Sequence, residues 1–428
     1  MTPEIKQRID QVCRGEVPEG YQRTILGIEP RSWNKSRIDK ICRLSSGSTP
    51  RRDAVENFNG DILWVTSGEL KRRTIWDTRE KISETAVVNS HLEIYDPGTV
   101  VIAIYGLEAA GIRGTVSIIG KQCTISQACM AFTEFKGVDN EFFYYWYLNN
   151  GQVIGLRYAQ GTKQQNLSTD IVGSFPICFP SQGEQQRIAA ILTTQDKVIE
   201  LKEKRLAEKQ RQKKYLMQQL LTGKKRLPGF SGEWKNIKLC EVLSERKEKN
   251  VEQNLRICSV AVQKGVVDQV EHLGRSYAAN DTSNYSVAHY GDIIYTKSPT
   301  GDFLYGIVKQ NLLQETVAVS PLYGVFTPMT FGLGYFLHTY FQSAICARNY
   351  LLPIVQKGAK NTINITNDTF ISSKLYLPLD AEEQTAIADT FIAADREIDL
   401  LRQDIEQEKQ KKKALMQLLL TGIVRVKT

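Results

Sequence analysis

The chain has 428 residues, which is too long for one ordinary hydrophobic core and predicts two to four compact units. Hydrophobic residues make up 42% and charged residues 24% of the chain, a composition typical of soluble globular proteins. No apolar run is long enough to span a membrane, and the first residues lack the apolar stretch of a signal peptide. We therefore expect a cytoplasmic protein without membrane contact.

The net charge of +8 combines 55 basic with 47 acidic residues. This balance favours an anionic partner only slightly, and a nucleic-acid-binding protein and a basic soluble enzyme both fit it. The eight cysteines are scattered, with no Cys-x-x-Cys pair, so the sequence predicts neither a zinc ribbon nor a disulfide framework.

Residues 1–30 form the first predicted segment. A short helical pattern at 9–14 is followed by Gly15, then by Pro18 and Tyr21. A comparable order recurs after residue 223, where Leu227-Pro228-Gly229-Phe230 precedes Trp234 as this segment precedes Trp33. We expect residues 1–30 to pack beside the C-terminal segment and to complete the second half of a repeat.

Residues 31–180 and 224–379 are predicted to be two mixed α/β domains. Short β-branched and aromatic runs, such as 98–105 and 291–297, alternate in them with Gly, Asp and Pro. An aromatic segment closes each domain. Its helical spacing favours core packing over a stacking surface for bases.

Residues 181–223 and 380–428 each contain a long predicted helix without an internal proline. The N-cap and terminal glycine are Ser181 and Gly223 in the first helix, and Asp380 and Gly422 in the second. A helix of about 38 residues spans roughly 57 Å. This is longer than a globular domain usually needs.

Apolar residues recur every seven positions along both helices, and the seam positions predicted to pair them are Leu192, Ile199, Leu206 and Leu220, and Phe391, Ile398, Ile405 and Leu419. A lysine, Lys213 or Lys412, occupies the same seam in each. A strict period of seven predicts a coiled coil, here an antiparallel pair of the two helices. The alternative is two independent amphipathic helices, each lying on its own domain.

The two helices are copies of each other, because residues 181–223 align without a gap to residues 380–422 at an offset of 199. The likeness extends upstream, where residues 161–170 answer to 358–368 with one inserted residue. Between them the domains match poorly. The sequence therefore predicts an α+β protein with a duplicated, circular two-fold frame and two diverged inserts.

Basic and amide residues gather at glycine-rich turns of both inserts. Such side chains contact phosphates and purine edges in DNA complexes, although each one alone is more often a solvated surface charge. As a set on two equivalent domains they favour DNA binding. The candidates are Arg51, Arg52, Lys71, Arg72, Arg73, Arg113, Lys163, Gln164, Gln165, Lys297, Lys357 and Lys360.

No catalytic motif accompanies these residues. The sequence contains no Pro-Pro, so the Asn/Asp-Pro-Pro-Tyr/Phe motif of adenine methyltransferases is absent, and so is a Walker A loop. Four histidines without an HExxH motif make a zinc site improbable. We predict a binding protein with neither catalytic residues nor a metal. A stand-alone methyltransferase or nuclease is disfavoured.

The chain resembles the specificity subunits of type I restriction–modification systems. The resemblance rests on Glu-Gln-x-x-Ile-Ala at 184 and 383 and on Leu-Met-Gln…Leu-Leu-Thr-Gly at 216 and 415. Further matching motifs are Gly47-Ser48-Thr49-Pro50, Gly161-Thr162-Lys163-Gln164-Gln165-Asn166 and Leu227-Pro228-Gly229-Phe230…Trp234.

The resemblance implies two target-recognition domains, each reading half of an interrupted double-stranded DNA site, with the helices setting the spacer. It also implies two modification (methyltransferase) subunits as partners, which would carry S-adenosylmethionine, and restriction subunits with ATP-driven translocation and cleavage. The chain itself would bind no cofactor. The alternative is a coiled-coil scaffold that binds proteins rather than DNA.

Overall fold

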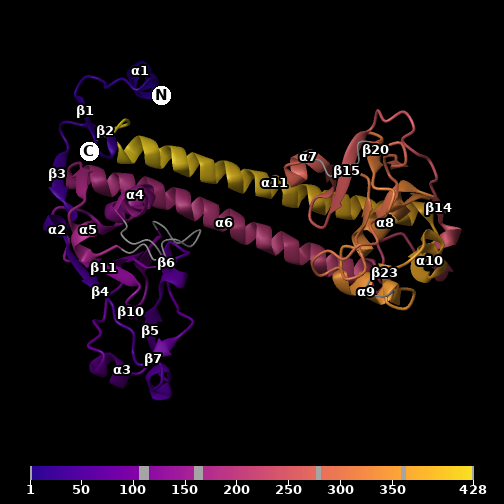
Figure 1. Ribbon diagram of the computed structural model, residues 1–428, viewed down its shortest axis with the longest axis horizontal. Coiled ribbons are helices and arrows are strands. Elements are labelled where there is room, and N and C mark those ends of the chain that lie inside the picture. Colours follow the sequence, from indigo (N-terminus) through magenta and orange to yellow (C-terminus); the bar gives the residue numbers. More distant parts are fainter. Residues whose placement is uncertain (1, 106–114, 159–166, 276–280, 358–362, 427–428) are drawn as a thin grey trace. The chain divides into compact units, whose positions relative to one another are not determined.

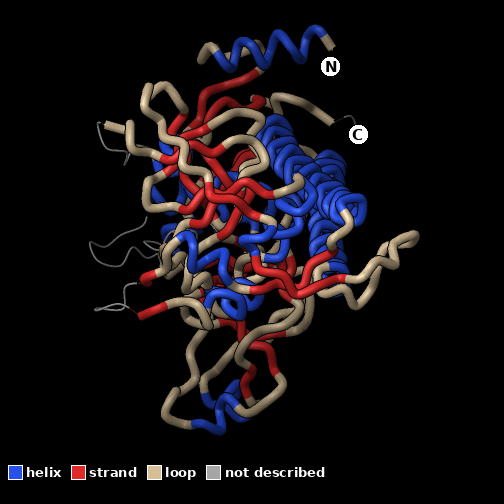
Figure 2. The backbone as a smooth tube through the Cα atoms, turned by 90° about the vertical axis from the view of Figure 1, so that its right-hand side faces the viewer, coloured by secondary structure: helices blue, strands red, loops and turns tan. Residues whose placement is uncertain are grey.

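The computed structural model describes residues 2–105, 115–158, 167–275, 281–357 and 363–426 (Figure 1). The chain divides into two compact units. Unit 1 comprises Met1–Lys202 with Asp404–Thr428, and unit 2 comprises Glu203–Gln403. Both units combine short strands with helices (Figure 2), so the expected mixed α/β class is confirmed.

In its described residues, unit 1 contains four sheets and several helices besides parts of the two long ones. Its first elements are α1 (Pro3–Cys13), β1 (Tyr21–Thr24), β2 (Gly27–Pro30), β3 (Asn34–Arg37), α2 (Ile38–Ile41), β4 (Arg43–Ser46), η1 (Val55–Phe58), β5 (Ile62–Val65), η2 (Ser67–Glu69), β6 (Thr74–Ile75), β7 (Lys81–Ile82) and α3 (Glu84–Asn89). They are followed by β8 (Val100–Ala103), β9 (Val116–Ile119), β10 (Cys123–Ile125), β11 (Cys129–Thr133), α4 (Asn140–Tyr158), α5 (Thr169–Gly173) and β12 (Pro176–Phe179).

The main sheet of unit 1, in the order β4-β11-β8-β9-β6, has both faces covered. Successive residues of a strand point to opposite faces. Accordingly Val100 and Ile102 of β8 join a core cluster with α4, whereas Val101 and Ala103 join a second cluster with β5 and β10. Burial on both faces explains why this strand reads as a continuous apolar run.

The aromatic segment of unit 1 is core, as predicted. All residues from Phe142 to Tyr147 in α4 are at most 3% exposed. In unit 2, helix α8 (Phe331–Tyr340) has the same role, since Tyr335, Phe336 and Leu337 are buried in the main core cluster there.

Unit 2 has a comparable set of elements. They are β13 (Trp234–Lys238), η3 (Leu239–Glu241), β14 (Leu243–Glu245), β15 (Arg256–Ala261), β16 (Gly265–Asp268), α7 (Gln269–Leu273), β17 (Ser286–Ala288), β18 (Ile293–Tyr295), β19 (Val308–Gln310), β20 (Val317–Val319), β21 (Gly324–Pro328), α8, α9 (Ala344–Leu351), β22 (Gln356–Lys357), β23 (Ile363–Asn364), α10 (Asn367–Ser372) and β24 (Lys374–Pro378). Four-stranded sheets in the orders β14-β21-β18-β19 and β16-β15-β20-β17 enclose its core.

The two long helices are α6 (Gln182–Leu220) and α11 (Ala381–Leu420), with 39 and 40 residues. Each has its first residue one position after the predicted N-cap. The glycine that follows each helix, Gly223 or Gly422, has a φ of +67° or +68°, the left-handed conformation expected there.

Each unit contains the start of one long helix and the end of the other. In unit 1, Leu192 of α6 and Leu419 of α11 belong to the same core cluster. In unit 2, Leu220 of α6 and Phe391 of α11 share the equivalent cluster. The long helices are therefore integral parts of both hydrophobic cores.

The N-terminal segment lies against the C-terminal end of α11 within unit 1. The Tyr21 hydroxyl donates to the Gly422 carbonyl at 2.7 Å, and Arg8 Nη1 donates to the Ile423 carbonyl at 2.8 Å. All eight cysteines are free. Among the described residues, no helix is both long and apolar enough to cross a membrane.

Candidate nucleic-acid interface

A polar cluster around Asp196 of α6 connects the helices of unit 1. The Asp196 carboxylate accepts a hydrogen bond from the Tyr145 hydroxyl of α4 at 2.7 Å and forms an ion pair with Lys412 Nζ of α11 at 2.6 Å. Arg73 donates to the same hydroxyl at 3.2 Å and pairs with Glu141. The cluster therefore fixes α4 to both α6 and α11 in this unit.

Unit 2 contains a second copy of this cluster, in which Asp395 and Lys213 are the counterparts of Asp196 and Lys412 at the 199-residue offset of the repeat. Asp395 of α11 accepts from the Tyr335 hydroxyl of α8 at 3.0 Å and pairs with Lys213 Nζ of α6 at 2.5 Å. Lys309 lies nearby, and burial lowers the pKa of its ammonium to about 8, with Lys213 acting in the same direction and Asp395 opposing. Burial also lowers the pKa of His338 well below its ordinary value. Unit 2 thus holds two cations, Lys213 and Lys309, beside the Asp395 carboxylate.

A second contact also occurs in both units. Arg425, three residues after the glycine that ends α11, binds both carboxylate oxygens of Glu184 at 2.8 and 2.7 Å in unit 1. Its guanidinium lies 5.9 Å from the ring centre of Trp33. In unit 2, Arg226 follows Gly223 at the same spacing and binds Glu383, with both distances 2.5 Å.

Arg226 lies over Trp234 at 5.4 Å, as Arg425 lies over Trp33. Glu184 and Glu383 are only 3% and 1% exposed, so each carboxylate needs its bidentate arginine to offset the loss of hydration. The sequence reasoning missed both arginines. Their identical spacing after the glycine that ends each helix was the available signal.

The loop Gly47-Ser48-Thr49-Pro50 after β4 leads into two of the candidate DNA contacts. Gly47 passes so close to Ile125 that a Cβ would lie 2.0 Å from the Ile125 carbonyl oxygen, so only glycine fits. The loop is then held by Trp64 Nε1, which donates to the Ser48 carbonyl at 3.2 Å. This leaves Arg51 exposed, in an ion pair of 2.7 Å with the equally exposed Asp53.

Arg52, in contrast, stacks over Phe58 at 4.5 Å and over Trp64 at 5.1 Å. It also pairs with Glu80, which brings the loop and the segment 71–81 to the same part of unit 1. Burial of one guanidinium face by aromatic rings leaves Arg52 less free than Arg51 to meet a phosphate.

The run Lys71-Arg72-Arg73 separates into exposed and enclosed members. Lys71 and Arg72 are exposed. The Arg73 side chain is only 26% exposed and is occupied by the contacts with Glu141 and Tyr145 described above. Lys71 and Arg72 are therefore the members of this run that are free to contact a phosphate.

In unit 2, Lys297 lies half-buried in the turn after β18 with a φ of +56°. Burial lowers the pKa of its ammonium, and Glu245 opposes this shift. Lys357 lies in β22, whose backbone pairs with β23. Five further candidates, Arg113, Lys163, Gln164, Gln165 and Lys360, lie outside the described residues.

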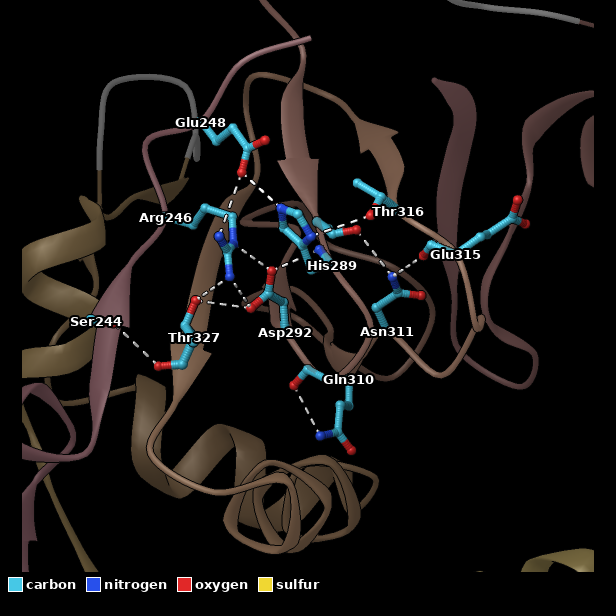
Figure 3. Close-up of polar contacts among 12 residues, drawn as sticks. Ser244, Arg246, Glu248, His289, Asp292, Gln310, Asn311, Glu315, Thr316 and Thr327 are labelled. Atoms are coloured by element: carbon cyan, nitrogen blue, oxygen red, sulfur yellow. Dashed lines mark hydrogen bonds and ion pairs between the residues drawn. The ribbon is translucent and has the colours of Figure 1, made fainter. Parts of the chain in front are cut away.

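A dense hydrogen-bonded network near these strands of unit 2 was not predicted (Figure 3). Arg246 binds both oxygens of the buried Asp292 carboxylate at 2.6 and 3.1 Å and donates to Thr327 Oγ1 at 2.8 Å. Beside it, the His289 ring contacts Glu248 at 2.8 Å through Nε2 and Thr316 at 3.2 Å through Nδ1.

This network connects the end of β14 to β18 and β21, and the Asp292–Arg246 contact holds the pKa of Arg246 above its ordinary value. The charge run Ser-Glu-Arg-Lys-Glu-Lys at 244–249 was the available signal for it. Lys247 and Lys249, on either side of Glu248, are exposed.

The residues predicted to pair the helices are buried or half-buried. Leu192 and Phe391 are fully buried, and Leu206 is half-buried. The other five, Ile199, Leu220, Ile398, Ile405 and Leu419, are between 3% and 8% exposed. In the described parts of the chain, no group of three or more His, Cys, Asp or Glu side chains could hold a metal ion.

Comparisons with known proteins point in the same direction as the sequence. Residues 30–210 match the family model of the type I restriction modification DNA specificity domain. The specificity subunit of the type I restriction enzyme MjaIX of Methanocaldococcus jannaschii is 29% identical over 188 residues, which are 43% of this chain and 42% of that subunit. The MjaVIII specificity subunit of the same organism is 22% identical over 426 residues, covering 93% of this chain and 94% of the relative.

Solved structures share the fold. The S subunit of a type I restriction–modification system from M. genitalium superposes with a TM-score of 0.58 and 13% identity, covering 90% of this chain and 96% of that chain. A chain from a study of assembly and conformational transition in the type I R-M system gives a TM-score of 0.52 at 15% identity, with 92% and 99% covered.

The class of protein that the comparisons indicate is that of the matched model: residues 30–210 are similar to the type I restriction modification DNA specificity domain. The resemblance of the chain to the specificity subunits of type I restriction–modification systems, predicted from the sequence, is confirmed.

Proposed function

We propose that this chain is the sequence-specific DNA-binding subunit of a type I restriction–modification complex. Each unit reads one half of a bipartite, interrupted DNA site. The observation that carries this proposal is the pair of contacts found in both units, Asp–Lys–Tyr and Glu–Arg–Trp, which hold two inserts of unrelated sequence on one duplicated frame. A constant frame with variable inserts is what the independent reading of two half-sites requires.

The long helices are proposed to form an antiparallel coiled coil that relates the two units by a circular pseudo-two-fold repeat. In unit 1, residues further along α6 pair with residues earlier in α11: Gln195 bonds to Glu408, and Lys202 pairs with Asp404. In unit 2, Lys209 pairs with Glu397 and Lys213 with Asp395. Helices of 39 and 40 residues would set a spacer of roughly 60 Å between the half-sites.

The complex would include two modification (methyltransferase) subunits docked on this helical frame, and restriction subunits for cleavage. S-adenosylmethionine would be bound by the modification subunits and supply the methyl group. This chain would contribute target recognition and positioning rather than catalysis.

Methylation sequencing of cells that carry the operon tests the proposal. With the chain present, one bipartite adenine-methylated motif is expected; deletion of this chain alone should abolish it. A methylation pattern that is unchanged by the deletion would contradict the proposal.

The second candidate, a scaffold that binds only proteins, predicts a different response to salt. Phosphate contacts make log K fall linearly with log salt, with a slope of about −0.9 for each neutralised phosphate. Filter binding of the assembled complex over a salt series is expected to show such a slope. A flat profile with no preference between DNA sequences would favour the scaffold.

A further inference from the structure

Trp76 occupies an unusual position at the edge of the main sheet in unit 1. It directly follows β6, the edge strand that pairs in parallel with β9 and is labelled in Figure 1. The last pair of that ladder is Ile75 with Ile119, and Gly120 N then donates to the Ile75 carbonyl at 2.9 Å. Trp76 therefore lies beside Gly120, where the sheet ends.

The Trp76 indole packs against this glycine. A Cβ at position 120 would lie 2.7 Å from Cε3 and 2.8 Å from Cδ2 of Trp76, so the ring occupies the space that any side chain would need. Even so, Trp76 is 68% exposed. An indole that packs against the Gly120 backbone and is otherwise open to solvent can stack against a nucleobase.

No other tryptophan of the chain is placed in this way. The remaining four of the five, Trp33, Trp64, Trp146 and Trp234, are between 1% and 4% exposed. Leaving a large apolar ring in water forgoes the free energy that its burial would provide. Trp76 is therefore a candidate contact residue.

The surroundings of Trp76 are cationic. Residues 71–81 contain five cations and two carboxylates, a net charge of +3. Both carboxylates have partners, because Asp77 pairs with Lys81 at 3.2 Å and Glu80 pairs with Arg52. Lys71, Arg72 and Arg79 are exposed and form no ion pair with any described residue.

This combination distinguishes between two kinds of partner. The centre of a protein–protein interface is depleted of charged residues, whereas an aromatic platform flanked by unpaired cations is the arrangement that binds bases and phosphates together. The chemistry around Trp76 favours nucleic acid over protein.

We infer that Trp76 is a DNA-contacting residue of unit 1, with its open indole face packed on a nucleobase or deoxyribose of the half-site that this unit reads. Lys71 and Arg72 hold the adjacent phosphates. The inference rests on the proposed function and identifies the side chain that adds an apolar, base-directed contact to the phosphate contacts. Access to a base face requires local unstacking, which wedge residues and base-flipping enzymes both produce in duplex DNA.

Fluorine NMR on the assembled complex tests the contact directly. The chain is labelled with 5-fluorotryptophan and combined with unlabelled partner subunits, and the Trp76 signal is assigned with Trp76→Phe. We expect one signal to be solvent-exposed in the free complex and to shift on addition of duplex DNA containing the motif, while the four buried tryptophans stay unchanged. A Trp76 signal unaffected by saturating DNA would overturn the inference.

Binding of the same duplex gives a second readout. Trp76→Ala is expected to weaken binding by about 5- to 150-fold, the range for loss of one base–aromatic stack. Trp76→Phe should restore most of it. Gly120→Ala should give an intermediate loss because it lifts the ring from its support. Val88→Ala, at another exposed apolar position of unit 1, is the matched control and should bind normally.

The outcomes separate the inference from the proposed function. If the wild-type complex methylates its motif and Trp76→Ala binds DNA equally well, the inference fails and the proposed function stands. If the complex with Trp76→Ala instead loses only its methyltransferase subunit, Trp76 belongs to a protein interface and the inference is again overturned. If the wild-type complex shows no preference for any DNA sequence, both fail.

Discussion

Replacing Lys309 of unit 2 by methionine is expected to stabilise the protein at neutral pH. The Lys309 side chain is 4% exposed in β19, and Asp395, whose charge favours its ammonium, is already paired with Lys213. The ordinary pKa of 10.5 falls to about 8 in the folded state. This difference corresponds to about 3 kcal/mol of stability lost by holding the charged form in the folded protein.

The pH dependence follows from the direction of this shift. Below pH 8 Lys309 is protonated in both the folded and the unfolded state, and the full cost is present. Between pH 8 and 10.5 the folded state has released the proton while the unfolded state still binds it, so wild-type stability rises with pH. Lys309→Met lacks this titration, and its advantage over the wild type should disappear towards pH 10.5.

Differential scanning calorimetry of the full chain measures this effect. For a unit of about 200 residues, 3 kcal/mol corresponds to roughly 6–12 °C in the unfolding midpoint at pH 7. Exposed Lys264→Met is the control and should leave the midpoint unchanged. A Lys309→Met protein that is less stable at pH 7, or an advantage that is equal at pH 7 and pH 10, would refute the reasoning.

Two further predictions concern unit 1. Gly422→Ala should destabilise the protein by more than the roughly 1–2 kcal/mol typical of a left-handed alanine, because its Cβ would lie 2.5 Å from Pro30 Cγ. The control is Gly229→Ala, which has open space around it and should show the backbone cost alone. Urea denaturation measures both variants. Arg73→Ala should lower the free energy of unfolding by about 1–2 kcal/mol, because it breaks the contacts with Glu141 and Tyr145. Arg72→Ala should leave stability unchanged but reduce the salt slope of DNA binding by about one. Equal effects of Arg72→Ala and Arg73→Ala in both assays would contradict the assignment of Arg72 to DNA and Arg73 to the fold.

The helical frame was predictable because its signals are local. Ser181 and Asp380 precede the helices, and glycine at 223 and 422 ends them, so both boundaries could be predicted within a residue or so. The repeat made these signals stronger, since the same pattern occurs twice. The burial of the seam residues also follows from their spacing.

The contacts that hold the frame were not predictable from one sequence. Arg425 and Glu184 are 241 residues apart, and nothing local shows that they meet. The three cations at 71–73 read alike in the sequence, yet Arg73 is enclosed by α4 and α6 while its neighbours are exposed. Such differences depend on tertiary packing. For the same reason, the DNA-contact role of individual cations stays a prediction.

Trp76 shows how structure adds a candidate that sequence reasoning passes over. A single tryptophan after a cationic run reads as a core residue, because tryptophan is highly buried on average. The structure shows that the ring lies beside Gly120 at the sheet edge and remains 68% exposed.

The central claim, two readers on a duplicated helical frame, is tested most directly by shortening both helices together. Deleting residues 203–209 and 402–408 removes one heptad from equivalent positions and retains the seam period. Each helix loses about 10 Å, or the length of about three base pairs. Methylation sequencing should then find both half-sites unchanged and a spacer about three base pairs shorter. An unchanged spacer, or an altered half-site sequence, would contradict the account.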